Sequence, residues 1–272
     1  MMMTINEALR HFELPRLEAR MLLSAETGFS HAELVSFATD ELTEQQWLAF
    51  AALAQRRLAG EPVAYLLGER EFYGRPFRVN PAVLIPRPET EHLVEAALDK
   101  VGRNRSARVV DLGTGSGAIA VTLALEAPQW QVSAVDLSAD ALAVAQQNAA
   151  NLGARIDFYH GSWLAPLPAG EPFDAIVSNP PYIDAGDQHL EEGDVRFEPR
   201  MALTDGNDGL DCLRAIAAQA PARLADGGWL LVEHGYDQGA ACRALFAAAG
   251  LQQVATLQDL AGNDRVTLGC RA

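Results

Sequence analysis

The chain has 272 residues, of which 49% are hydrophobic and 21% are charged. This is a globular composition, and the length suffices for one large or two modest domains. The net charge of -15 repels phosphate backbones and anionic membrane surfaces, so the composition disfavours nucleic acid as a partner.

The cysteines and the N-terminus bear on the cellular setting. Cys212, Cys242 and Cys270 are widely spaced and form neither a CxxC motif nor a Cys/His pair at metal-ligand spacing. The first residues lack the apolar core of a signal peptide, and no run approaches membrane-spanning length. We therefore expect a cytoplasmic protein with reduced cysteines, no bound metal and no membrane contact.

Residues 1–68 carry helix signals alone, so we expect a small helical bundle there that forms a separate, substrate-binding domain. The helices of this region are bounded by favourable capping residues. These are Pro15 in a first turn, the capping boxes of Ser30 with Glu33 and of Thr43 with Gln46, and the stops Gly28 and Gly60.

The next segment, residues 69–86, predicts a β-hairpin that links two domains. Aromatic and β-branched residues lie on either side of Gly74-Arg75 in the stretch EFYGRPFRV. Pro76 lacks a backbone N–H, so its strand should lie at an edge. A helix should begin near Pro88, since acidic residues follow in its first turn.

From residue 107 onward, short apolar runs alternate with helical stretches. The runs are ARVVDLG, QVSAVDL, RIDFYHG, FDAIVSN and WLLVEHG. Such alternation is typical of an α/β fold with a doubly wound, Rossmann-like parallel sheet, which we expect over residues 87–272. The final run, RVTLGC, has no helix after it and predicts a closing strand at the sheet edge.

The first of these strands runs into a glycine-rich loop. Closely spaced glycines allow a tight turn and let a ligand lie against the N–H groups at the start of the next helix. The spacing departs from the dinucleotide fingerprint, which disfavours a pyrophosphate, and a tight turn without a ligand is the alternative. The loop residues are Gly113, Thr114, Gly115, Ser116 and Gly117.

Asp136 ends the second strand about 20 residues past this loop. An acid at that place can reach the two ribose hydroxyls of an adenosine, although a helix cap before Ser138 is the alternative. S-adenosylmethionine is an adenosine ligand without phosphates, and its positive charge suits an acidic cleft. Trp163 follows the third strand, where its indole could stack on adenine or pack in the core.

The fourth strand ends in Ser178-Asn179-Pro180-Pro181-Tyr182, at the sheet end where ligands bind. Asn179 precedes a proline, which holds it extended. Pro181 has no N–H, so the carbonyl of Pro180 is free to accept a hydrogen bond. The oxygens of Asn179 and Pro180 can then each take one hydrogen of a planar NH2 group, on which Tyr182 could stack.

This arrangement suggests a way to activate a poor nucleophile. Two acceptors that hold both hydrogens out of plane favour a pyramidal nitrogen whose lone pair faces a sulfonium methyl. Alignment and fixed dipoles would supply the catalysis, without a metal or a strong base. The sequence thus predicts an S-adenosylmethionine-dependent amino-methyltransferase, with an ordinary Asn-Pro turn as the alternative.

Beyond these residues, the chain resembles the release-factor glutamine methyltransferases of the PrmC/HemK type over nearly its whole length. NPPY alone is shared with DNA and RNA amino-methyltransferases, whereas LIPRPETE and GNDRVTLG are far more specific. The motifs that carry the resemblance are LIPRPETE (84–91), VVDLGTGSGAIA (109–120), SNPPYI (178–183), VRFEPRMAL (195–203), LLVEHG (230–235) and GNDRVTLG (262–269).

The resemblance implies a reaction and a role for each site residue. The substrates would be peptide-chain release factors 1 and 2, methylated on the glutamine amide of their Gly-Gly-Gln motif, with S-adenosylhomocysteine as the second product. Gly113 to Gly117 would hold the methionine part of the cofactor, Asp136 its ribose and Trp163 its adenine side. Asn179 to Tyr182 would hold the glutamine, and Asn179 would also border the cofactor.

Two rival functions are open at this point. A nucleic-acid amino-methyltransferase would need a basic groove, against which the net charge of -15 argues. A non-catalytic cofactor sensor that binds release factors would need no poised Asn179. The acidic stretch over residues 183–209 is interpreted as a substrate-facing flap or as a solvated loop. We expect a monomer.

Overall fold

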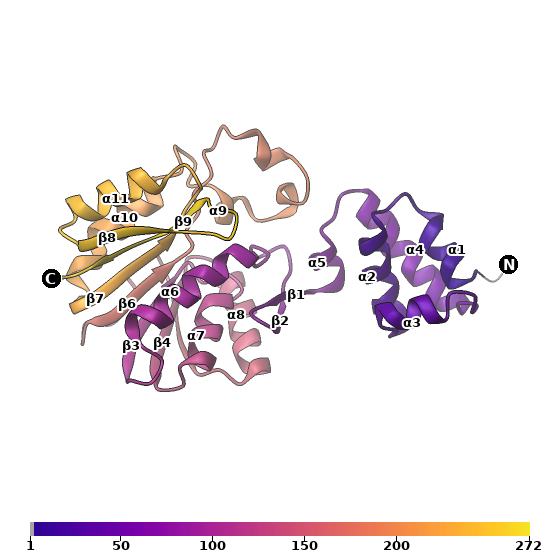
Figure 1. Cartoon of the computed structure of the whole chain (residues 1–272), viewed down its shortest axis with the longest axis horizontal. Coiled ribbons are helices and arrows are strands. Elements are labelled where there is room, and N and C mark those ends of the chain that lie inside the picture. Colours follow the sequence, from indigo (N-terminus) through magenta and orange to yellow (C-terminus); the bar gives the residue numbers. More distant parts are fainter. Residues whose placement is uncertain (1–2) are drawn as a thin grey trace. The chain divides into compact units, whose positions relative to one another are not determined.

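The computed structural model describes residues 3–272 of the chain (Figure 1). The chain divides into two compact units, each with its own apolar core. One unit runs to Glu69 and includes Glu192–Phe197, and the other comprises Arg70–Glu191 and Glu198–Ala272. No helix within residues 3–272 is long and apolar enough to cross a membrane.

The smaller unit is a helical bundle. Capping boxes begin α3 at Ser30 and α4 at Thr43, as predicted, and Gly28 ends α2 in the left-handed conformation. Leu22 and Phe50 are among the fully buried side chains of its core. The helices are α1 (Ile5–His11), α2 (Arg16–Thr27), α3 (His31–Ser36), α4 (Glu44–Leu58) and α5 (Val63–Leu67).

A two-stranded hairpin follows the helices. Tyr73 and Gly74 join its strands, and both have positive φ. Such a turn suits a hairpin, because its twist matches that of the flanking strands. Phe72 and Phe77 from the hairpin are buried in the core of the larger unit. The two strands are β1 (Glu69–Phe72) and β2 (Arg75–Arg78).

A seven-stranded sheet forms the centre of the larger unit. The strand order is β5-β4-β3-β6-β7-β9-β8, and β3 to β7 run parallel. The order reverses between β3 and β6, which is where ligand crevices form in such sheets. The strands are β3 (Ala107–Leu112), β4 (Trp130–Asp136), β5 (Ile156–His160), β6 (Phe173–Ser178), β7 (Leu224–Glu233), β8 (Gln252–Gln258) and β9 (Asp264–Cys270).

Helices cover both faces of this sheet (Figure 1). One apolar cluster involves α6 (Glu91–Val101), α7 (Ala118–Glu126) and α8 (Ala139–Leu152). The second cluster involves α10 (Asp211–Gln219) and α11 (Gly239–Ala248). The predicted α/β fold with a doubly wound, Rossmann-like sheet is therefore confirmed.

The C-terminal strand does not lie at the sheet edge, so that prediction was wrong. β9 lies between β7 and β8 and is antiparallel to both. Its residues 266–270 are all buried, and an uncharged run of this kind is typical of an interior strand. The edge strand on this side of the sheet is β8, which was missed because its sequence QQVATLQ is mostly polar and exposed.

The segment between β6 and α10 is long and carries only short helices. Glu198 within it is buried, forms an ion pair with Arg87 and accepts a hydrogen bond from the backbone N of Ile85 at 2.9 Å. Around Glu198, the segment is therefore anchored to the larger unit. The short helices are η2 (Gln188–Glu191), η3 (Val195–Phe197) and α9 (Arg200–Leu203).

Candidate active site

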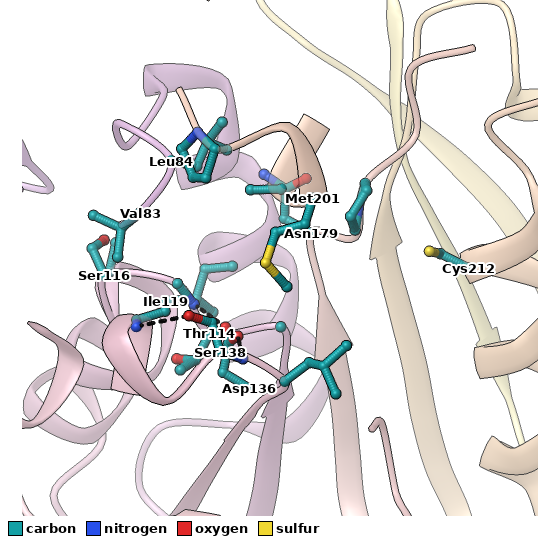
Figure 2. A pocket seen from close by; sticks show the side chains of 18 of the residues that line it. Val83, Leu84, Thr114, Ser116, Ile119, Asp136, Ser138, Asn179, Met201 and Cys212 are labelled. Carbon is teal, nitrogen blue, oxygen red and sulfur yellow. Dashed lines mark hydrogen bonds between the residues drawn. The ribbon is translucent and has the colours of Figure 1, made fainter. Parts of the chain in front are cut away.

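A cavity of about 400 Å³ lies at the carboxyl ends of β3, β4 and β6, next to the point where the strand order reverses. Its lining residues all belong to the larger unit. Figure 2 shows Asp136, Ser138, Asn179 and Met201 around it. The predicted site residues that line it are Gly113, Thr114, Gly115, Ser116, Asp136, Trp163, Asn179 and Pro181.

The glycine loop turns sharply between β3 and α7. Gly113, Gly115 and Gly117 have φ values of +73°, +54° and +81°, a region that L side chains rarely adopt. Gly117 lies outside the cavity lining, and a Cβ added to it would lie 3.1 Å from the Cβ of Ala145 on α8. This glycine therefore shapes the loop by close packing of two helices.

Asp136 is fixed at the end of β4 by two backbone donors. Its Oδ2 accepts a hydrogen bond from Gly115 N at 2.8 Å, and its Oδ1 accepts one from Ser138 N at 2.8 Å. Burial raises the pKa of this carboxyl, although both backbone N–H groups lower it. Each carboxylate oxygen keeps a further lone pair, so Asp136 can still accept from hydroxyl groups of a ligand in the cavity.

A second carboxyl, Asp111, lies beneath the loop and was not predicted as part of the site. It accepts a hydrogen bond from the Thr114 hydroxyl at 2.6 Å, and its Oδ1 has no hydrogen-bond partner within residues 3–272. Burial, with a smaller effect of Asp136, raises its pKa to about 7. Its place directly before the loop in DLGTGSG is the signal that could have found it.

Trp163 lies against the start of the glycine loop. A Cβ added to Gly113 would lie 3.8 Å from the Trp163 ring. The tryptophan has a φ of +48°, which is strained for a bulky residue and is found mostly where surrounding structure imposes it. Trp163 also packs against the apolar cluster beneath α10 and α11, so it contacts the core and lines the cavity.

The side-chain amide of Asn179 is held in one orientation. The Ser178 hydroxyl donates to the carbonyl of Leu112 at 2.7 Å, which ties the end of β6 to the end of β3. Nδ2 of Asn179 donates to Oγ1 of Thr90 at 3.1 Å. Within the described chain, no group donates a hydrogen bond to Oδ1 of Asn179 or to the carbonyl oxygen of Pro180. Both predicted acceptors therefore keep their lone pairs.

Tyr182 lies outside the cavity lining and faces a buried glutamate. Its hydroxyl is 3.4 Å from Oε1 of Glu233, and its backbone carbonyl accepts a hydrogen bond from Nε2 of Gln238 at 2.9 Å. Burial raises the pKa of the Tyr182 hydroxyl. In this structure, Tyr182 supports the Pro180-Pro181 corner and does not border the cavity.

The segment before α6 forms another part of the cavity wall. Arg87 lines the cavity and is held by its ion pair with the buried Glu198. Glu198 belongs to the acidic stretch 183–209, which the sequence leaves open as a flap or a solvated loop. Its burial could not be predicted, because it depends on contacts with residues more than a hundred positions away in the sequence. The lining residues of this segment and of the stretch 183–209 are Ala82, Val83, Leu84, Pro86, Arg87, Thr90, Pro199, Met201, Ala202, Thr204 and Asp205.

Sequence comparisons bear directly on this arrangement. The family model "Methyltransferase small domain" matches residues 90–194, and "PrmC N-terminal domain" matches residues 4–68. The release factor glutamine methyltransferase of Neisseria gonorrhoeae is 57% identical over 98% of this chain and 97% of that protein. The Bordetella pertussis enzyme of the same name is 56% identical over 94% of this chain and 95% of that protein. The chain belongs to the release factor glutamine methyltransferases.

Solved structures share the fold of this release factor glutamine methyltransferase. The T. thermophilus 16S rRNA N2 G1207 methyltransferase RsmC, in complex with AdoMet and guanosine, matches with a TM-score of 0.56 and 22% identity over 75% of this chain and 50% of that chain. A methyltransferase from Pyrococcus furiosus matches with a TM-score of 0.55 and 16% identity over 80% of this chain and 97% of that chain. These likenesses show the fold alone.

Gly209 lies close to the backbone of Tyr182, directly after the Pro180-Pro181 turn. Its substitution therefore tests whether the loop around Gly209 supports this turn. A Cβ at Gly209 would lie 2.2 Å from the carbonyl oxygen of Tyr182, and its φ is +74°. Gly206 in the same loop has a φ of +85° but open space around a Cβ. We expect Gly206→Ala to destabilise by about 1 kcal/mol and Gly209→Ala by about 3 kcal/mol or more, since only the latter adds a backbone clash.

Thermal denaturation of the two variants checks this difference. Equal losses in Tm for Gly206→Ala and Gly209→Ala would mean that the backbone at residue 182 yields to the added methyl group, and that the loop does not brace it.

Proposed function

We propose that this chain transfers a methyl group from S-adenosylmethionine to the glutamine amide nitrogen in the Gly-Gly-Gln motif of class I peptide-chain release factors. Family membership over nearly the whole chain supports the reaction. The observation that carries the proposal is the side-chain amide of Asn179, which lines the cavity. Its nitrogen donates to Thr90, and its oxygen accepts no hydrogen bond within residues 3–272.

The residues of the cavity fit S-adenosylmethionine. The positive-φ glycines leave room for a ligand against the backbone, and the carboxylate of Asp136 keeps lone pairs for the ribose hydroxyls. Trp163 offers a ring at the adenine side. When bound, this cofactor supplies an electrophilic methyl group on a positively charged sulfur, which the acidic surroundings favour.

The chain itself would bind and orient the substrate carboxamide. Oδ1 of Asn179 and the carbonyl oxygen of Pro180 would each accept one hydrogen of the NH2 group. Pro180 and Pro181 restrict the backbone at this corner, so little reorganisation is needed as positive charge develops on the nitrogen. The surplus proton would leave to solvent afterwards, which explains why a strong base is not required.

The role of the smaller unit is a further part of the proposal. It exposes large apolar side chains on its helices, among them Leu17, Leu48 and Leu58, and its matched family domain separates it from the methyltransferase region. We infer that it binds the body of release factors 1 and 2 while the cavity takes the tripeptide. Because these factors act on ribosomes, the reaction would take place in the cytoplasm.

Label transfer tests the proposed function directly. The protein and methyl-labelled S-adenosylmethionine would be incubated with purified release factors 1 and 2, with Gln→Ala versions of both, with a peptide containing Gly-Gly-Gln, and with nucleic acid. We expect label only on the glutamine of the tripeptide, located by mass spectrometry, and a higher kcat/KM for intact factor than for the peptide. Label on nucleic acid, or cofactor binding without any transfer, would contradict the proposal and favour one of the two rival functions.

A further inference from the structure

Thr90 is the last residue of the short helix η1 (Pro88–Thr90) and comes directly before α6. Its hydroxyl makes no bond to the first turn of α6 and accepts a hydrogen bond from Nδ2 of Asn179 at 3.1 Å. Thr90 is only 4% exposed. Its buried hydroxyl therefore bonds a side chain that lines the cavity.

Glu233 lies next to this pair, at the end of β7 beside β6. It is only 1% exposed, the Tyr182 hydroxyl faces its Oε1, and its Oε2 has no partner in good hydrogen-bond geometry within residues 3–272. Burial raises its pKa to about 7, although the nearby Thr90 hydroxyl, Arg265 and Tyr182 lower it. An incompletely paired buried carboxylate destabilises a fold, so packing alone does not account for Glu233.

We propose that Glu233 and Thr90 are positioning residues that fix which end of the Asn179 amide faces the substrate. This inference rests on the proposed function. A carboxylate only accepts hydrogen bonds, so the Tyr182 hydroxyl donates to Oε1 of Glu233. Oε2, which lacks a partner within residues 3–272, favours a Thr90 hydroxyl whose proton is turned toward Glu233. The Thr90 oxygen then offers only lone pairs to Asn179, which must present its NH2 group. The carbonyl oxygen of Asn179 is thereby left as the acceptor for the substrate NH2 group.

Loss of the charge on Glu233 removes this constraint. The Thr90 proton is then free to turn toward Asn179, and the Asn179 amide can rotate by half a turn. In that orientation the Asn179 NH2 group faces the NH2 group of the substrate, and two donors repel each other. The ionised form of Glu233 is therefore the active one, and methyl transfer should fall as the pH falls through about 7.

Few other charges act on Glu233. Arg265 on β9 lowers the pKa of Glu233, and the exposed Glu89 in the short helix η1 (Pro88–Thr90) raises it. On α6, which also packs against β7, Glu91 accepts a hydrogen bond from Tyr73 N at 2.9 Å. Asp111 also titrates near pH 7, so an acid limb in the wild-type pH profile must be assigned by substitution.

We call this arrangement, in which Glu233 orients the Thr90 hydroxyl and Thr90 orients the Asn179 amide, the relay. A double-mutant cycle tests it. Thr90→Val removes the hydroxyl, and Glu233→Met removes the carboxylate that accepts hydrogen bonds. Both variants keep the approximate shape of the side chain. We expect each to lower single-turnover methylation of release factor by about 10- to 100-fold at pH 8, with the affinity for S-adenosylmethionine within a few fold by calorimetry. The double variant should be no slower than the slower single variant, because both changes remove the same orientation of the Thr90 hydroxyl toward Asn179.

Two further variants control for folding and for the hydroxyl. Thr90→Ser retains the hydroxyl and should recover most of the rate. Thr122→Val removes a buried hydroxyl on α7 that has no hydrogen-bond partner within residues 3–272, so it should leave rate and pH profile unchanged. Thr90→Val and Glu233→Met should both lose the acid limb near pH 7, whereas a limb that belongs to Asp111 would persist in both.

Stability gives a readout that is independent of turnover. The pKa of Glu233 in the folded protein lies above its value in the unfolded chain, so ionisation of Glu233 destabilises the fold. This destabilisation begins near pH 4.5 and is complete above about pH 7. Glu233→Met should therefore raise Tm at pH 8, and the gain should shrink toward pH 4.5. A merely structural Glu233 would instead lower Tm when replaced.

The outcomes separate the relay from the proposed function. If wild type methylates the release factor while Thr90→Val and Glu233→Met keep wild-type rates, or if their effects add, the relay is wrong and the proposed function stands. If wild type transfers no methyl group, the proposed function fails. Should one variant not fold, the other variant and the wild-type pH profile between pH 6 and 8 decide, and a flat wild-type profile overturns the relay.

Discussion

Replacing Asn179 by alanine is expected to slow methyl transfer to release factor by 10²- to 10³-fold, or about 2.7 to 4 kcal/mol, the scale of removing one fixed polar group from a transition state. The Asn179 oxygen accepts no hydrogen bond within the described chain, whereas its nitrogen is bound by Thr90. The oxygen is thus available to the substrate amide. Alanine removes that acceptor and leaves the Pro180 carbonyl alone.

The measurement is a single-turnover rate with saturating S-adenosylmethionine, together with the calorimetric affinity for the cofactor. The affinity should stay within a few fold of wild type, because Asp136 and the glycine loop are unchanged. Asn151→Ala on the exposed side of α8 is a matched control, since the side chain of Asn151 accepts a hydrogen bond from the neighbouring Gln147 and lies outside the cavity lining. Near-normal turnover of Asn179→Ala would remove the acceptor role.

The fold could be predicted from the sequence wherever local signals decide it. Ser30 and Thr43 begin their helices through contacts three residues away, and the apolar runs that end in Leu112 and Ser178 are long enough to specify buried strands. The strand β8 was missed because its edge position relieves it of the need for an apolar face. Because β8 was missed, its partner β9 was wrongly placed at the edge of the sheet.

In the candidate site, too, local sequence signals predicted some residues, whereas contacts between distant residues could not be predicted. Asp136, Gly113 and Gly115 were predicted because strand-loop-helix spacing places them, and the structure brings them to the cavity with Asn179 and Pro181. The partners of Asn179 could not be predicted. Thr90 lies 89 residues away in sequence, and Tyr182 meets Glu233 across 51 residues, so only the assembled sheet brings these groups together. Burial of Glu233 likewise depends on the strand order.

The second large effect concerns the cofactor. Asp136→Ala is expected to weaken binding of S-adenosylmethionine by about 100-fold or more, since hydrogen bonds to a charged group contribute about 1.5 to 3 kcal/mol each and the ribose offers two hydroxyls. The variant also releases the N–H groups of Gly115 and Ser138, which now hold the carboxylate at 2.8 Å. Titration calorimetry of the purified variant measures the change without any methyl acceptor.

The pH dependence of this binding has a definite sign. Burial raises the pKa of Asp136, so its carboxylate takes up a proton at a higher pH than an ordinary aspartate, and cofactor affinity should begin to fall correspondingly early on acidification. Asp157→Ala on the exposed face of β5 controls for loss of a carboxylate elsewhere on the sheet. Wild-type affinity in Asp136→Ala would place this carboxylate outside the site. If Asp136→Ala and Asn179→Ala both fail in cofactor binding alone, the strand ends of β4 and β6 serve one ligand, and the substrate amide must bind elsewhere.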